Sequence, residues 1–133
     1  MAVTATPVFA QSPACNIATL TSATAITSRA NITGTTGLVQ LCPSSTNGKR
    51  IDRIHIKSKA TSVASNLSIW IYNGTTSFLY DEIAIAAVTA SNTAASNETD
   101  VSFENLVLPP SFQLYISVTV ATDLTVFAHG GDF

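Results

Sequence analysis

Two histidines, His55 and His129, are the side chains in this 133-residue chain best suited to act as a general base. Neither lies in a recognisable catalytic motif, because the sequence contains no Gly-x-Ser-x-Gly turn, no phosphate-binding loop and no His-Glu-x-x-His pattern. His55 falls on the polar face of an expected strand, as a solvated histidine does. His129 and Asp132 offer two metal ligands, fewer than a zinc site uses. The sequence therefore predicts no enzyme, no catalytic residue, no metal site and no cofactor.

Carboxylates are concentrated in one segment, at Glu98, Asp100 and Glu104. Together with backbone carbonyls, such side chains can bind a calcium ion. Their spacing matches no calcium loop, so a solvated acidic turn is the favoured interpretation. Asp81 and Glu82 cannot act on one substrate as a pair, because adjacent side chains of a strand point to opposite faces.

Positive charge is concentrated in one eleven-residue segment, which carries five of the six Lys and Arg residues, Lys49, Arg50, Arg53, Lys57 and Lys59. Because strand side chains alternate, Arg53, Lys57 and Lys59 are expected to share a face with His55, opposite the intervening isoleucines. This basic stripe has two interpretations that stay open at this point. It is either a contact surface for an acidic protein or polyanion, or an edge strand whose lysines discourage unwanted pairing.

Trp70 and Tyr72 alternate with aliphatic residues in the next expected strand, so they are predicted to point outward. They could anchor a protein interface, or stack on a sugar together with Tyr115. Alternatively, they lie beneath a loop or in a second part of the core. The candidate contact residues for a partner are therefore Arg53, His55, Lys57, Lys59, Trp70 and Tyr72.

The composition is poor in charge, with 11% charged and 46% hydrophobic residues and a formal net charge of −2. Typical globular domains contain roughly 25% charged residues. A weakly charged surface is expected where partners cover it, although an ordinary secreted β-domain has the same composition. The net charge argues against nucleic-acid binding, and no apolar run approaches the roughly 20 residues of a membrane span. Cys15 and Cys42 could pair or remain free.

Apolar residues recur with a period of two between clusters of turn residues, which is the pattern of short β-strands. The expected strands cover residues 37–41, 50–59, 66–72, 78–87, 101–103, 112–120 and 124–128. Asn73-Gly74 predicts a type I′ hairpin turn, and residues 89–99 are expected to form a polar loop. These features predict an all-β protein, an antiparallel β-sandwich of jelly-roll or immunoglobulin-like topology.

Two units are expected along the chain. Residues 1–14 contain two prolines and no clear periodicity, which predicts an extended N-terminal arm. Residues 15–133 are expected to form a single β-sandwich domain.

Five short segments are specific as an ordered set. They are Asn47-Gly-Lys-Arg-Ile-Asp-Arg-Ile-His-Ile-Lys57, Leu67-Ser-Ile-Trp-Ile-Tyr-Asn-Gly-Thr75, Tyr80-Asp-Glu-Ile83, Leu106-Val-Leu-Pro-Pro110 and Ala128-His-Gly-Gly-Asp-Phe133. Through them, the chain from about Gly37 onward resembles the capsid decoration, or cement, proteins of tailed bacteriophages. The resemblance implies a β-sandwich that decorates or cements the capsid, often as a homotrimer over the joints between capsomers, and that has no catalytic residues.

The expected function is therefore that of a virion structural protein, made in the host cytoplasm and located on the capsid exterior. It would bind the major capsid protein and stabilise contacts between capsid subunits, with the N-terminal arm as a clamp. The alternatives are a carbohydrate-binding β-sandwich module and a fibre or adsorption component of a phage.

Overall fold

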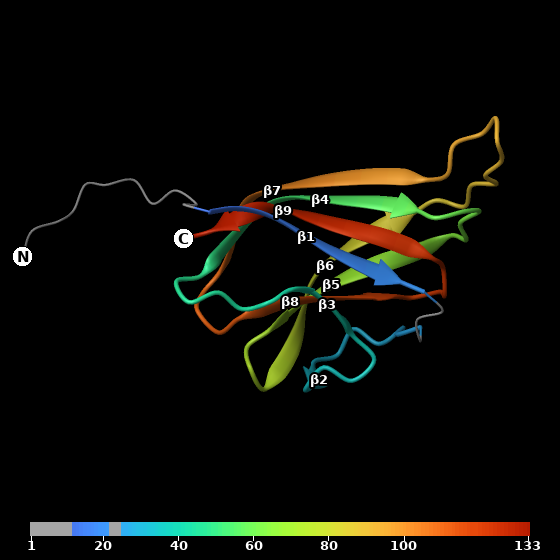
Figure 1. Ribbon diagram of the computed structural model, residues 1–133. Helices are drawn as coiled ribbons and strands as arrows, with labels where there is room; N and C mark the ends of the chain where they lie inside the picture. Colours follow the sequence, from blue (N-terminus) through green and yellow to red (C-terminus); the bar gives the residue numbers. More distant parts are fainter. Residues whose placement is uncertain (1–11, 22–24) are drawn as a thin grey trace, which may run out of the picture.

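The computed structural model describes residues 12–21 and 25–133, which form nine β-strands and no helix (Figure 1). The strands are β1 (Ser12–Leu20), β2 (Ile32–Thr33), β3 (Val39–Cys42), β4 (Lys49–Ser58), β5 (Ser65–Tyr72), β6 (Thr76–Ile85), β7 (Glu98–Leu108), β8 (Gln113–Val118) and β9 (Leu124–Asp132). A search of these residues for a helix long and apolar enough to cross a membrane found none.

Two antiparallel sheets pack face to face, which confirms the predicted β-sandwich. The four-stranded sheet has the order β1-β9-β4-β7, and the five-stranded sheet has the order β2-β6-β5-β8-β3. In Figure 1 the four-stranded sheet forms the upper layer, and the start of β1 lies beside the C-terminus at one end of the sandwich. That proximity follows from the register, since Ser12 pairs with Asp132.

The order of pairing distinguishes between the two predicted topologies. With the two-residue β2 set aside, the first strand pairs with the last, β3 with β8, β4 with β7 and β5 with β6. An immunoglobulin-like sandwich instead places its first two strands side by side in one sheet. The nested pairing found here is that of a jelly roll, in which one long hairpin folds over into two Greek keys.

Strand β4 shows how local sequence determines which side chains enter the core. Ile54 and Ile56 are fully buried, and the residues between and beside them face outward, as the alternation predicts. In the pairing of β4 with β9 the register shifts between Ile51 and Arg53, so Asp52 is an extra residue on β4, a β-bulge. In the pairing of β4 with β7 the register shifts at the same place, but there the extra residues lie on β7. The bulge reverses the alternation, and as a result Lys49 and Ile51 are also buried.

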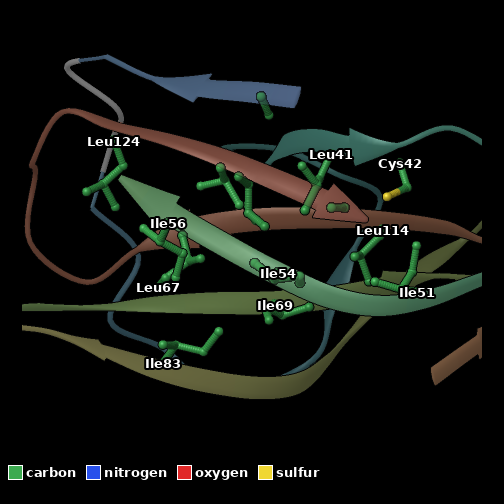
Figure 2. Packing of buried hydrophobic residues seen from close by; sticks show 14 of the residues in the cluster. Leu41, Cys42, Ile51, Ile54, Ile56, Leu67, Ile69, Ile83, Leu114 and Leu124 are labelled. Atoms are coloured by element: carbon green, nitrogen blue, oxygen red, sulfur yellow. The ribbon is translucent and has the colours of Figure 1, made fainter. Parts of the chain in front are cut away.

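The core is a single layer of aliphatic side chains between the two sheets (Figure 2). Its fully buried members include Leu20, Ile51, Ile54, Ile56, Leu67, Ile69, Leu106, Leu108, Leu114, Ile116 and Leu124. Each such side chain stabilises the folded state by about 1.5–3 kcal/mol relative to an exposed position.

The Asn73-Gly74 turn differs in detail from the prediction. The Asn73 amide donates to the Thr76 carbonyl at 3.2 Å, so Gly74 and Thr75 are the two central residues. Gly74 has φ of 98°, and Thr75 is not among the residues with positive φ. Positive φ at the first central position alone is the pattern of a type II′ turn, not type I′. The Asn73 side chain also accepts hydrogen bonds from the amides of Thr75 and Thr76.

The N-terminal boundary also differs from the expected one. Strand β1 begins at Ser12, so residues 12–14 pair with β9 and belong to the sandwich. Residues 1–11, the rest of the expected arm, lie outside the described residues. The β1 sequence, with a proline and several small residues, shows little alternation of apolar and polar side chains. Backbone pairing with β9 determines where the strand begins.

The two cysteines are both free thiols, which answers the question that the sequence left open. Cys15 is exposed on β1, whereas Cys42 is buried at the end of β3. Burial raises the pKa of the Cys42 thiol to about 12, because the thiolate would lose its hydration.

We expect the two thiols to react in sequence. At pH 8 the native protein should consume one equivalent of a thiol reagent, at Cys15, and a second equivalent only after unfolding in urea. Mass spectrometry of the alkylated peptides checks the order. Rapid alkylation of Cys42 in the native state would contradict the buried position of β3.

Candidate binding surface

The outer face of the four-stranded sheet brings side chains from four strands into rows. The register places Cys15, His129, Arg53 and Ser102 in one row across β1, β9, β4 and β7. The next row is Ile17, Phe127, His55 and Asp100, and the third is Thr19, Thr125, Lys57 and Glu98. Every residue of these rows is at least partly exposed, so the face is a continuous surface rather than a second core.

Strand β7 supplies carboxylates to the basic residues of β4. His55 Nδ1 lies 2.8 Å from Asp100 Oδ1, and His55 Nε2 lies 3.6 Å from Glu98 Oε1. Arg53 Nε lies 3.8 Å from Asp100 Oδ1, and Lys57 Nζ lies 3.7 Å from Glu98 Oε2. About half of the Arg53 and Asp100 side chains is exposed, so such pairs contribute about 1 kcal/mol or less each.

These residues line an open cleft of about 470 Å³, here called the charged cleft. Its lining consists of Arg53, His55, Lys57, Glu98, Asp100, Phe127 and His129. With neutral histidines, two cations and two carboxylates leave the cleft without net formal charge. The predicted basic stripe is therefore half of a mixed-charge surface. Such a surface has no net positive charge to attract a polyanion.

The second interpretation of the stripe, a lysine-protected edge strand, is wrong. β4 lies between β9 and β7, and both of its edges are hydrogen-bonded. The stripe is also shorter than predicted. Arg53, His55 and Lys57 do share the outer face, but Lys59 lies beyond the end of β4 and does not line the charged cleft.

The predicted outward aromatic residues have separate environments. Trp70 is fully buried, and its Nε1 donates to Ser117 Oγ at 2.9 Å. It is absent from the main core cluster, and its burial contradicts the predicted outward exposure. Tyr72 is half-buried, and its ring meets that of Tyr115 edge-on at 5.7 Å. A buried indole and two perpendicular phenol rings do not form a flat platform for a sugar.

One group of ligating side chains in the described part of the chain could hold a metal ion: His55, Glu98 and Asp100, whose ligand atoms all lie within 4.8 Å of one another. Arg53 and Lys57 already pair with the two carboxylates, so a cation would have to displace both ion pairs. Glu104, the third member of the acidic group expected from the sequence, is absent from this set. It lies where the β4–β7 register shifts.

His129 and Asp132 do not form the ligand pair that their spacing suggested. His129 lines the charged cleft. Asp132 instead pairs with Lys49, whose side chain is only 4% exposed. Strict alternation would have placed Lys49 beside Arg53, so nothing in the sequence indicated its burial.

A further group of aromatic side chains, on β6 and β7, was not predicted from the sequence. Phe78 and Tyr80 on β6 are 41% and 46% exposed, and the Tyr80 ring lies 6.1 Å from that of Phe103 on β7. The apolar spacing of two at Phe78 and Tyr80 was visible in the sequence. Their exposure depends on the register shift opposite Trp70, which leaves Tyr80 as the extra residue.

The described lining of the charged cleft consists of charged and aromatic side chains and contains no serine or cysteine. No family model, no curated protein and no solved structure matches the chain.

We expect the β7 carboxylates to suppress anion binding by β4. Asp100→Asn should increase retention on a heparin column, because it frees Arg53 and His55. Glu104→Gln makes the same change in net charge away from the cleft and should shift the elution less. Equal shifts for the two variants would show that only net charge matters.

Proposed function

We propose that this protein is a virion structural protein that binds the outside of a tailed-phage capsid and cements contacts between subunits of the major capsid protein. The observation that carries the proposal is the unprotected outer edge of β1. A cement protein needs no reacting group, because binding across the joint of two folded subunits is enough to stabilise both.

Strand β1 is an edge strand that carries no formal charge. β9 occupies one side of it, and no described strand pairs with the other side. None of its nine residues is acidic or basic, and Ile17 is 60% exposed. Pro13 removes one backbone donor near the start of the strand, and the remaining residues can still pair with an extended segment. Such an edge can accept a further strand by main-chain hydrogen bonding.

The opposite edge of the same sheet is protected. Strand β7 carries Glu98, Asp100 and Glu104, and all three are exposed. Charged residues on an edge discourage pairing with another chain. The sheet therefore has one edge suited to pairing and one that resists it, which is the asymmetry expected of a protein that attaches in one orientation.

A capsid subunit is the partner that we propose for β1. The resemblance to decoration proteins, carried by segments from Asn47 to Phe133, supports this choice. The jelly roll is also a recurrent architecture of capsid domains, although it occurs in lectins as well. The low charge content agrees with a surface that is largely covered in the particle.

We further propose that the protein attaches as a homotrimer. Exposed apolar residues occur at several separate places, among them Ile17 on β1, Phe78 on β6 and Val107 on β7. One capsid contact cannot cover all of them, and contacts between copies would cover the others.

The number of copies per particle tests the proposed location. Quantitative mass spectrometry of purified particles should find this chain in numbers comparable to the major capsid protein. A handful of copies would instead assign it to a tail fibre, and its absence from particles would refute the proposal.

A charge placed on the β1 edge should weaken attachment. We expect Ile17→Lys to reduce binding to capsids stripped of this protein by roughly tenfold or more, which corresponds to about 1.4 kcal/mol. Val63→Lys is the matched control, because Val63 is 50% exposed and lies between β4 and β5, outside the edge. Circular dichroism confirms that both variants fold. Equal binding by both would exclude β1 as the attachment edge.

A further inference from the structure

The most unusual charged residue of the chain is Lys49, at the start of β4. Its side chain is only 4% exposed, whereas lysine is almost never buried without a partner. Lys49 Nζ lies 3.0 Å from Asn16 Oδ1 and 3.2 Å from Asp132 Oδ1. A primary amine, a carboxamide and a carboxyl group therefore meet at the end of the buried Lys49 side chain, where Asn16 and Asp132 are partly exposed.

The three side chains come from three neighbouring strands. Asn16 is on β1, Asp132 on β9 and Lys49 on β4, and β9 lies between the other two. The Lys49 side chain thus reaches from β4 past β9 to the edge strand. Ala128 and Gly130 are the intervening inward positions of β9, opposite Ile54 and Ile51, and both have small side chains or none. The Asp52 bulge turns Lys49 inward, as described above.

Asp132 Oδ1 provides a second, independent observation. This atom is buried and makes no hydrogen bond in the described structure, because its contact with Lys49 Nζ lacks hydrogen-bond geometry. A buried oxygen that makes no hydrogen bond is uncommon in folded proteins, and this one belongs to a side chain that is 38% exposed in total. It lies where a proton leaving Lys49 could be received.

We propose that Lys49 and Asn16 form an intramolecular isopeptide bond, with Asp132 as the proton-transfer residue. Lysine amines are competent nucleophiles when held without their proton in an apolar site. The carbonyl carbon of Asn16 is at most about 4.2 Å from Lys49 Nζ, since a C=O bond is about 1.23 Å long. A reactive conformer has roughly 3–3.5 Å between the reacting atoms, so Nζ and the carbonyl carbon must move closer together for the attack.

The reaction needs no oxidant and no further reactant. Asp132 accepts a proton from the Lys49 ammonium group, and the neutral Nζ attacks Cγ of Asn16. The resulting tetrahedral intermediate returns to an amide when the Cγ–Nδ2 bond breaks. Asp132 gives its proton to the departing nitrogen and then takes the second proton from Nζ. The leaving ammonia carries that proton away as ammonium, which restores the carboxylate of Asp132. The product is a secondary amide between Nζ of Lys49 and Cγ of Asn16.

Such a bond would join the edge strand to an interior strand. Backbone pairing with β9 is the hydrogen-bonded connection of β1 within its sheet. A covalent bond from Asn16 to Lys49 would hold β1 in place across β9. This inference does not depend on the proposed attachment to a capsid.

Mass spectrometry of the purified full-length chain tests the proposal. After denaturation, its mass should be lower than the sequence mass by one ammonia molecule. Trypsin cannot cleave after a modified Lys49, so the digest should contain residues 1–29 joined to residues 30–50. This branched peptide distinguishes the isopeptide bond from loss of ammonia at Asn47-Gly48 or Asn73-Gly74, which would leave the peptides separate.

Three variants identify the roles of the residues. Asn16→Ala should have its full mass and give no branched peptide. Asp132→Asn, which keeps the shape of the side chain, should also lack the bond while giving the circular dichroism spectrum of the folded protein. Lys57→Arg, a change in an exposed residue of the same strand, should still give the branched peptide.

The wild-type chain decides the matter even if a variant fails to fold. Full mass and a free Lys49 peptide in folded wild-type protein, after prolonged incubation at pH 8, would overturn the proposal. A branched peptide that persists in folded Asp132→Asn would retain the bond and overturn the role of Asp132.

Discussion

The ladder between β4 and β9 is the interaction on which the rest of the structure depends. It lies in the middle of the four-stranded sheet and joins a strand from the first half of the chain to the last strand. On its outer side it places Arg53 and His55 beside His129 and Phe127. On its inner side it places Lys49 next to Asp132. The surface site and the buried site are thus two faces of one ladder.

The bulge at Asp52 separates these two faces. In a regular strand, Lys49 would have the same orientation as Arg53 and would add a further positive charge to the charged cleft. The extra residue instead turns Lys49 toward the interior. Gly130 contributes to the same geometry, because an added Cβ atom there would lie 1.9 Å from the Arg50 carbonyl oxygen. The close approach of β4 and β9 at the bulge is therefore possible only with glycine at this position.

The sequence predicted the strands that alternate most regularly. Within β4 and β5, aliphatic residues at every second position identified both the strand and its buried face, as at Ile54 and Ile56. Asn73-Gly74 correctly located the hairpin between β5 and β6, although not its turn type. The double-Greek-key order was not predictable in the same way, because it depends on pairings between strands far apart in the chain.

The candidate site was predictable only in part, for the same reason. Alternation showed that Arg53, His55 and Lys57 share a face, but it cannot tell which strand lies alongside. The pairing of β4 with β7 brings Glu98 and Asp100 to that face, and it turns a basic stripe into a neutral cleft. Trp70 shows the complementary limit, since a residue on an outer face can still be fully buried.

The start of β1 and the end of β9 lie side by side, because Ser12 pairs with Asp132. This has a mechanical consequence for any force applied to the chain at Ser12. A pull along the strand axis would load all nine residue pairs of the β1–β9 ladder in shear at the same time. A pull across the sheet would instead open the pairs one after another, beginning at Ser12. The β1–β9 ladder therefore resists a force along the strands more strongly than a force across the sheet.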